Sequence, residues 1–277
     1  KCNPGIDITV KREYLRAECK RAIETPGYQN TFRRLHLNQW VEQETRWLDM
    51  VTWEGNGGEF SEKELEGRNC FAGLDLSTTT DITALILLFP PAGDDLKWHL
   101  ICRFWVPSEG IRKRAERDRV PYDVWQRQGF IEATEGNVVD YDVIRERVKE
   151  LAQRFRIVEI AFDRWNSSQL VTQLQNDGAV MVPIGQGYVS LSAPTKEMEK
   201  LILGRLLAHG DNPVLKWMAS NVATEQDAAG NIKPSKRKST ERIDGIVAVV
   251  MALARTIAYN ADGERSIYEQ REIFALG

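Results

Sequence analysis

Two apolar runs joined by a short hydroxyl-rich turn, over residues 70–89, constrain the fold of this chain most. The first run, 70–76, predicts a buried strand with Asp75 near its end, and the second run, 82–89, begins directly after Asp81. An ionised carboxylate inside a strand costs several kcal/mol unless it is compensated. A metal ion or the hydroxyls of residues 77–80 could compensate Asp75, and this segment alone favours neither.

Composition restricts the class of protein. With 277 residues, 42% hydrophobic and 28% charged, the chain suits one large soluble domain with a small appendage, and no window approaches a membrane span. The four cysteines form no C-x-x-C pair, which argues against a disulfide framework or structural zinc and fits a reducing, intracellular compartment. A net charge of −3 leaves DNA binding to local basic clusters. The start at Lys1, without methionine or signal sequence, suggests a fragment of a longer protein.

The first 58 residues are predicted to differ from the rest of the chain. Residues 9–25 predict an amphipathic helix that ends at Pro26, and 27–54 form an aromatic-rich segment whose large side chains are too irregularly spaced for one helix face. We expect this segment to be a linker packed onto its neighbours. The glycine-rich run 55–58 is the best domain boundary, and 61–67 predicts one or two capped helical turns.

Beyond the boundary the pattern is that of an α/β domain. Strand candidates at 70–76, 82–89 and 97–106 have short connections, which predicts an antiparallel meander. The strand, helix and strand at 157–162, 167–176 and 179–184 predict a parallel pair with a crossover. The remaining predicted elements are a solvated helix at 111–119, a strand at 130–134, helices at 140–155, 192–208 and 212–220, a hairpin or loop at 221–238, a buried helix at 240–259 and a polar tail from 262.

Three aspartates stand at notable places in this series. Asp75 lies on the first strand, Asp163 ends a later strand, and Asp244 lies in the first turn of the last, apolar helix. Each has a local explanation, as a turn acceptor, a helix cap or a favourable charge at a helix N-terminus. Together with the order of elements, however, they resemble the layout of a ribonuclease H-like domain, with a mixed central sheet, antiparallel then parallel, flanked by helices.

That resemblance implies a metal site. In such a domain the strands 70–76 and 157–162 are neighbours, so Asp75 and Asp163 would face one another while Asp244 reaches in from the packed helix. Three like charges at close range repel. Two divalent cations, about 4 Å apart, would resolve the repulsion, activate a water and stabilise the leaving oxygen of a phosphodiester. Carboxylate ligands favour Mg²⁺ or Mn²⁺.

Several ordered motifs make the resemblance specific. The segments 73–84 (GLDLSTTTDITA), 161–166 (AFDRWN), 209–217 (HGDNPVLKW) with 220–222, and 242–248 (RIDGIVA) resemble the nuclease domain of tailed-bacteriophage terminase large subunits. Residues 30–40 resemble the stretch that joins the ATPase domain of these proteins to the nuclease. The likeness therefore covers nearly the whole chain and implies three parts: an N-terminal helix and linker at 1–58, a nuclease domain at 59–262 and a polar C-terminal tail at 263–277.

The resemblance also implies an activity and partners. The domain would cut concatemeric double-stranded viral DNA during packaging, with Asp75, Asp163 and Asp244 as the metal-binding triad and Asp81 as an accessory acid. Expected partners are double-stranded DNA and, in the full motor, the small terminase subunit and the portal protein. The isolated domain is expected to be a monomer in the host cytoplasm, absent from the mature virion. The sequence has no G-x-x-x-x-G-K-[ST] phosphate loop, so ATP hydrolysis is not expected.

Basic residues near the third aspartate predict a surface for the DNA backbone. They are Lys233, Lys236, Arg237, Lys238 and Arg242. Their position would place phosphate-binding groups beside the metals, the alternative being an ordinary solvated loop. Arg164 and Asn166, next to Asp163, could orient substrate, and Trp165 could stack on a base. None of the three histidines is assigned a catalytic role.

Three other functions fit parts of this pattern. A transposase, integrase or junction resolvase shares the carboxylate geometry, although integrases usually complete their triad with glutamate where this chain has Asp244. A catalytically silent docking module of the packaging motor would use the acids for a structural ion or a partner. A simple DNA-binding domain would show salt-sensitive binding without metal-dependent cleavage.

Overall fold

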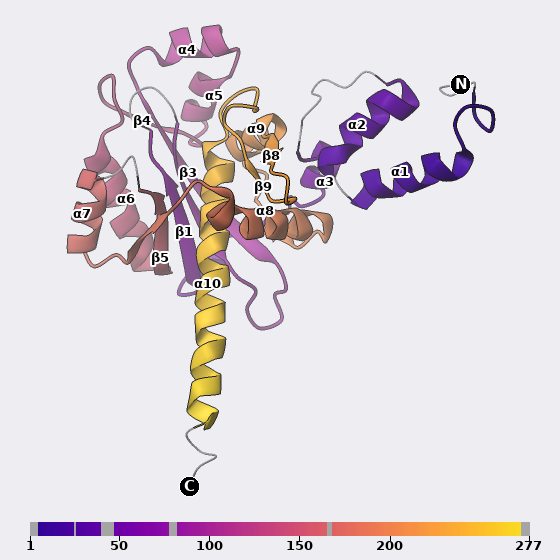
Figure 1. Ribbon diagram of the computed structural model, residues 1–277. Coiled ribbons are helices and arrows are strands. Elements are labelled where there is room, and N and C mark those ends of the chain that lie inside the picture. The colour runs from indigo at the N-terminus through magenta and orange to yellow at the C-terminus, as the bar shows by residue number, and fades with distance from the viewer. Residues whose placement is uncertain (1–4, 25, 40–46, 78–81, 165–167, 273–277) are drawn as a thin grey trace.

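A mixed sheet forms the centre of the molecule, with helices on both of its faces (Figure 1). The computed structural model describes residues 5–24, 26–39, 47–77, 82–164 and 168–272. The strands are β1 (Asn69–Asp75), β2 (Thr83–Phe89), β3 (Trp98–Pro107), β4 (Glu132–Thr134), β5 (Arg156–Asp163), β6 (Met181–Ile184), β7 (Leu207–Ala208), β8 (Thr224–Gln226) and β9 (Ile232–Pro234).

The helices account for most of the remaining described residues. They are α1 (Arg12–Glu24), α2 (Pro26–Leu37), α3 (Met50–Glu54), the short 3₁₀ helix η1 (Glu62–Leu65), α4 (Ile111–Asp118), α5 (Tyr122–Arg127), α6 (Tyr141–Arg154), α7 (Ser168–Asn176), α8 (Tyr188–Leu203), α9 (Pro213–Asn221) and α10 (Asp244–Glu272). In the part of the chain that is described, no helix is long and apolar enough to cross a membrane.

The strand order is β4-β3-β2-β1-β5-β6, and β7 pairs with β3. β1, β2 and β3 form the predicted antiparallel meander, while β5 is parallel to both β1 and β6. The predicted fold class is therefore confirmed. The strand β7 was not predicted, because the expected helix 192–208 ends early: α8 stops at Leu203, and Arg205 adopts a left-handed φ of 53°.

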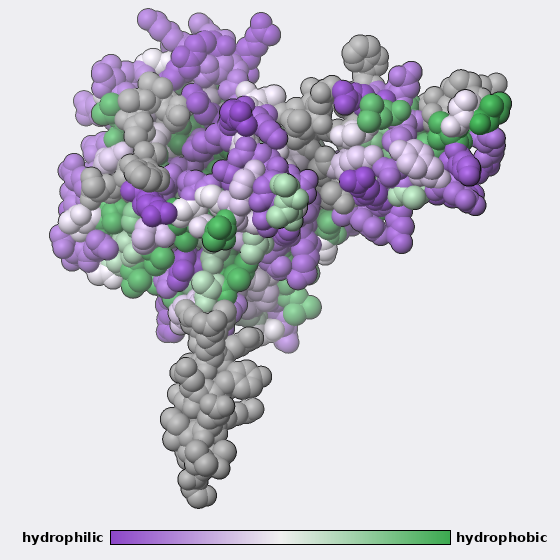
Figure 2. Space-filling view, viewed as in Figure 1, coloured by the Kyte–Doolittle hydropathy of each residue, from purple (hydrophilic) through white to green (hydrophobic). Residues whose placement is uncertain are grey.

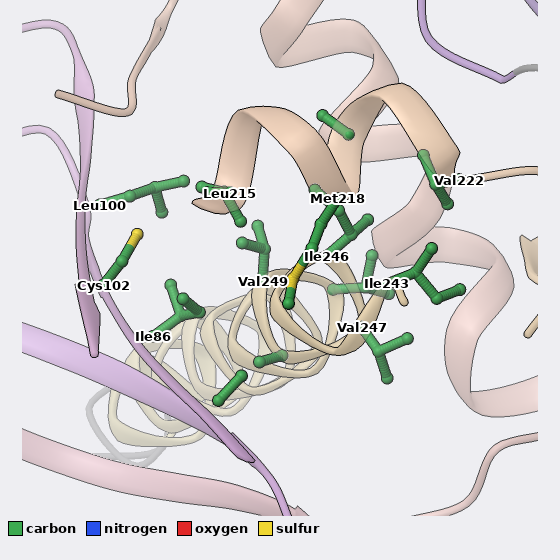
Figure 3. Close-up of a cluster of buried hydrophobic side chains, with 14 of the residues drawn as sticks. Ile86, Leu100, Cys102, Leu215, Met218, Val222, Ile243, Ile246, Val247 and Val249 are labelled. Carbon is green, nitrogen blue, oxygen red and sulfur yellow. The ribbon is translucent and has the colours of Figure 1, made fainter. Parts of the chain in front are cut away.

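Each face of the sheet buries its own apolar cluster. All seven residues of β2 are buried, as expected for a central strand covered on both sides. Side chains of β2 that point to one face pack with α8, α9 and α10, and Figure 3 shows Ile86 facing Val249 of α10. Those that point to the other face, including Leu85 and Leu87, pack with α6 and α7.

Small residues let α10 press against β1. A side-chain carbon added at Gly73 would lie 1.9 Å from the carbonyl oxygen of Ala248, so the strand and helix backbones are in direct contact there. Gly245 is similarly enclosed by Met218, Leu215 and Phe104. The predicted buried helix is thus confirmed, but it is longer than predicted: it begins at Asp244 and continues to Glu272, and its last part extends away from the sheet (Figure 1). The polar segment from 263 is therefore helical as far as residue 272.

The aromatic-rich segment 27–54, predicted to be a linker packed onto its neighbours, contains two helices that were not predicted, and its residues 40–46 lie outside the described part of the chain. Residues 26–37 form α2, which packs beside α1, and residues 50–54 form α3, capped by the Asp49 carboxylate. Pro26 follows the end of α1 at Glu24, as predicted, and also occupies the first position of α2, where its missing N–H costs nothing. Figure 1 shows the pair α1 and α2 lying to one side of the sheet and its helices.

The charged segment 111–119 behaves as predicted. It forms α4, none of whose residues is buried. Figure 2 shows hydrophilic side chains over this end of the molecule. The next segment forms α5, a helix that was not predicted, whose Tyr122 and Trp125 are buried. The amphipathic helix predicted at 140–155 is α6, and the Asp140 carboxylate accepts a hydrogen bond from the Asp142 amide at its start.

Candidate active site

Two of the three predicted acids end neighbouring parallel strands. The register of β1 and β5 pairs Leu74 with Phe162, so Asp75 and Asp163 are the next residues along the two strands. Asp75 is 4% exposed, whereas Asp163 is only partly buried. Because the carboxyl ends of parallel strands meet at one edge of a sheet, the two side chains lie at the same edge.

The third acid reaches this edge from α10. Asp244 begins that helix and is 5% exposed. The close approach of Gly73 and Ala248, one turn further along α10, fixes the helix start beside the end of β1. A carboxylate in the first turn of a helix is favoured by the exposed N–H groups there. The packing that buries α10 therefore also brings Asp244 to Asp75.

Lys236 connects the two buried carboxylates. Its Nζ lies 2.9 Å from Oδ2 of Asp75 and 2.7 Å from Oδ1 of Asp244. The other oxygen of Asp244, Oδ2, is buried and has no hydrogen-bond partner among the described residues. Two acids from sequence positions far apart thus share one cation.

The charges in this cluster alter its acid–base behaviour. The pKa of Asp75 is raised to about 7: burial raises it most, the Lys236 ammonium offsets this in part, and the charges of Asp244 and Asp163 add to the increase. Burial lowers the pKa of Lys236, but the two carboxylates outweigh this effect and raise it above its usual value. The lysine therefore stays protonated. A cation of higher charge at the same place would stabilise the ionised form of Asp75 more than the lysine does.

A cavity of about 370 Å³ opens at this cluster. Asp75 and Asp163 line it on the sheet side, and Glu225, Lys233 and Arg237 line it on the side of the hairpin formed by β8 and β9. A larger cavity of about 450 Å³ lies along β3 between Phe60 and Phe130. Its acids are already paired with arginines, so the smaller cavity is the better candidate for chemistry.

The predicted basic residues are distributed unevenly around this cavity. Lys233, Lys236 and Arg237 line it, and Lys238 is exposed on the same loop. Arg242 instead lines a small cavity with Asp118 and Tyr122. The remaining predicted residues are also accounted for: Arg164 is exposed directly after β5, and Asp81, Trp165 and Asn166 lie outside the described residues.

Sequence reasoning missed the acid on the hairpin. Glu225, on β8, is 3.0 Å from Lys233 Nζ and accepts a hydrogen bond from the Ser235 hydroxyl. Lys233 also donates to the carbonyl oxygen of Gln186 at 2.9 Å. Nothing in the local pattern marks Glu225, because its place at the cavity depends on how the hairpin folds back over the sheet edge.

The donor set fits a hard divalent cation. Within the described ranges, no three side chains of His, Cys, Asp or Glu are grouped tightly enough to hold a metal ion as they stand. At Asp75 and Asp244 the Lys236 ammonium occupies the space between the two carboxylates. Carboxylate oxygens, one of them buried and unpartnered on Asp244, are the ligands that Mg²⁺ and Mn²⁺ prefer.

Comparisons with known proteins give relatives for nearly the whole chain. The large terminase subunit of Enterobacteria phage HK97 is 35% identical over 254 residues, which cover 91% of this chain and 49% of that protein. The crystal structure of the HK97 large terminase matches with a TM-score of 0.69 and 34% identity, over 91% of this chain and 52% of the other. Protein YmfN of Escherichia coli K12 is 28% identical over 95% of this chain and 60% of its own length.

The chain thus spans about half the length of the HK97 relative. A solved large terminase nuclease domain from phage SPP1, with bound Mn, is far more distant, at 13% identity and a TM-score of 0.43 over 72% of this chain and 94% of the other. The family described as "Terminase large subunit, endonuclease domain" matches residues 1–260. This chain belongs to the family of terminase large subunit endonuclease domains.

Proposed function

We propose that this chain is a metal-dependent endonuclease that cuts concatemeric double-stranded viral DNA during genome packaging. One observation carries the proposal: two buried carboxylates, Asp75 and Asp244, share a single cation at a cavity that Asp163 also lines. Burying a cluster of acids costs free energy, and in a member of an endonuclease family that cost is explained if the acids act in catalysis.

Asp75, Asp163 and Asp244 would hold the metal, with Asp81 as the accessory acid that the sequence suggests. When bound, a pair of divalent ions supplies Lewis-acid stabilisation of the scissile phosphate and a water of lowered pKa. The chain's own part is to keep the carboxylates in place on rigid elements. β1 and β5 fix two of them, and α10, packed onto β1, fixes the third.

The hairpin and the loop after it would position the DNA. Arg237 and Lys238 are exposed beside the cavity, and Lys233 is braced by Glu225. Cations at this place would bind phosphates next to the scissile bond, with Arg164 and Arg242 contributing from the end of β5 and the start of α10. Phosphates carry no base information, so we expect cleavage with little sequence preference.

The wider setting is proposed from the family. We propose double-stranded DNA as the substrate, the small terminase subunit and the portal protein as partners in the full motor, a monomeric state for this chain alone, and the host cytoplasm as the place of action. The family match and the HK97 relative favour this activity over that of a transposase or resolvase of the same superfamily. A silent docking module is the alternative that metal-dependent cutting of DNA would exclude.

The test is Mn²⁺-dependent nicking of supercoiled plasmid by purified protein. Asp75→Asn and Asp244→Asn should each lower the rate about a thousandfold or more, since losing a metal ligand removes several kcal/mol of transition-state stabilisation. Asp94→Asn, which changes an exposed acid in the β2–β3 turn, should cut like the unaltered chain. Circular dichroism should show all three variants folded. A folded Asp75→Asn variant that still nicks would refute the proposal.

A further inference from the structure

We propose that Lys236 is the resident counter-ion of this site, and that it leaves Asp75 and Asp244 when a divalent ion binds there. The inference rests on the proposed function, because it takes the site to be a metal site. It goes beyond it by assigning to Lys236 a role in metal binding, distinct from contact with DNA, and by predicting that the lysine weakens the affinity of the site for metal.

The geometry places the ammonium in competition with a metal. Nζ lies 2.9 Å from an oxygen of Asp75 and 2.7 Å from an oxygen of Asp244, so one point charge bridges carboxylates from β1 and α10. A divalent ion bound by the same two oxygens would need the same space. Lys236 and the ion therefore cannot both make these contacts.

The side chain is also free to leave. Although its ammonium rests on two buried carboxylates, 58% of the Lys236 side chain is exposed. Its backbone belongs to a turn tied down by hydrogen bonds from the Lys238 and Ser239 amides to the carbonyl oxygen of Ser235. Departure thus requires only new side-chain torsions, with the hairpin left in place.

Two neighbouring cations, Lys233 and Arg237, are directed to Glu225 on the hairpin instead. Lys233 is engaged by Glu225 at 3.0 Å and by the Gln186 carbonyl at 2.9 Å. Arg237 Nη2 lies 3.8 Å from Glu225. Both cations are thus directed toward Glu225, whereas Lys236 contacts Asp75 and Asp244.

One ammonium leaves the pair Asp75 and Asp244 incompletely satisfied. It contacts one oxygen of each carboxylate, and Oδ2 of Asp244 is buried without a partner in the described part of the chain. A doubly charged ion with several coordination positions suits such a cluster better than a single ammonium does. Lys236 would therefore hold the acids together in the metal-free protein at the cost of a lower apparent metal affinity, since metal binds only the fraction of molecules in which the lysine has left.

Calorimetric titration of the whole chain with Mn²⁺ tests this competition. Lys236→Met removes the charge and keeps an unbranched stem, and it should bind Mn²⁺ about tenfold or more tightly than the unaltered chain. Lys216→Met is the matched control, because Lys216 is an exposed lysine paired with Glu54 away from the cavity, and it should leave the affinity unchanged. Equal or weaker binding by a folded Lys236→Met variant would overturn the inference alone. Absence of Mn²⁺ binding in all three proteins would overturn the proposed function as well.

A second measurement uses the unaltered chain, so it holds even if the variant fails to fold without metal. Acetylation by a soluble active ester, mapped by peptide mass spectrometry, should label Lys236 slowly without metal because its amine is engaged by two carboxylates. Saturating Mn²⁺ should speed the labelling of Lys236 several-fold and leave Lys216 unchanged. An unchanged Lys236 rate in protein that has bound Mn²⁺ would show that the lysine stays in place.

Discussion

The free-energy cost of burying charge at this site is concentrated at the carboxylate of Asp75. It is buried at the end of a central strand, with two further carboxylates nearby and one lysine as its partner. Its pKa is raised to about 7, most strongly by burial, so near neutral pH the proton competes with any cation for the carboxylate. A residue under such constraint is typical of a functional site.

The raised pKa gives a prediction for the pH dependence of metal binding. A protonated Asp75 cannot coordinate a cation, so Mn²⁺ affinity should be full above pH 7 and fall as the pH drops below it, by roughly tenfold per pH unit at most. Calorimetric titrations at several pH values between about 5.5 and 8.5 would measure this, with a melting curve at each pH to show that the protein is folded. Equal affinities at the two ends of that range would contradict the prediction.

At the residue scale the sequence predicted the acids but not their surroundings. Asp75 and Asp244 stood out because each interrupts an apolar pattern, which is visible without a structure. Lys236 was predicted only as one of several phosphate-binding cations. Its contact with both acids, like the position of Glu225, arises from the folding of the hairpin over the sheet edge, and no local pattern encodes that.

At the scale of elements, the packing of α10 on β1 determines whether the site forms. Gly73 and Ala248 meet backbone to backbone, and Asp75 and Asp244 are two and four residues away from them along their elements. Any side chain at position 73 would push the helix and the strand apart. The contact therefore contributes both to the stability of the fold and to the relative position of the Asp75 and Asp244 carboxylates.

Gly73→Ala should accordingly destabilise the protein by about 3 kcal/mol, at the upper end of the range for overpacking, because the added carbon would lie 1.9 Å from a backbone oxygen. Urea unfolding followed by circular dichroism would measure the change. Gly55→Ala is the matched control, since its φ of −67° suits alanine and the nearest atom to the added carbon is 3.4 Å away. Similar unfolding midpoints for the two variants would show that the contact at Gly73 is unimportant.

The loop after β9 makes a separate prediction about DNA affinity. Arg237→Ala and Lys238→Ala should each weaken binding to a duplex oligonucleotide and reduce the slope of log affinity against log salt by about 1. Fluorescence anisotropy in the presence of a chelator would measure this without cleavage. Lys113→Ala, on the exposed surface of α4, should leave the slope unchanged, in keeping with the solvated helix predicted there. An unchanged slope for the loop variants would mean that the loop does not contact phosphates.

Elements with a strong local apolar pattern were predicted well, and those stabilised by tertiary contacts were not. The strands β1, β2 and β3 and the helix α6 have strong local patterns and were found close to their observed bounds. α2 was missed because Tyr28 and Phe32, which lie four residues apart on one helix face, were considered together with the irregularly spaced tryptophans that follow, and β7 because two residues carry too little pattern. Pairing with Trp98 and His99 of β3 defines that strand.

For the molecule as a whole, we propose where the part of the chain that folds alone begins. The sequence suggests divisions at residues 58 and 262. Trp47, Leu48 and Trp53 nevertheless lie in the apolar cluster around α10, and Trp53 stacks on His209 with ring centroids 4.5 Å apart. We therefore place the start of the unit that folds alone before residue 47.

Two truncations distinguish a boundary before residue 47 from a boundary at residue 58. Removing residues 1–46 should leave a cooperatively folded nuclease domain. Removing residues 1–58 should unfold it, because losing one buried tryptophan costs about 3–5 kcal/mol and the whole domain is stable by only about 5–15 kcal/mol. Thermal melting followed by circular dichroism would compare them. A cooperative transition at the same temperature in both would place the boundary at residue 58.

The central claim is that Asp75, Asp163 and Asp244 together bind divalent ions. Crystals of the chain soaked in Mn²⁺, with diffraction collected at the manganese absorption edge, test it most directly. We expect anomalous peaks within coordination distance of the carboxylates of Asp75 and Asp244, with Asp163 as a further ligand. Anomalous peaks confined to other parts of the molecule, with these carboxylates unligated, would contradict the claim.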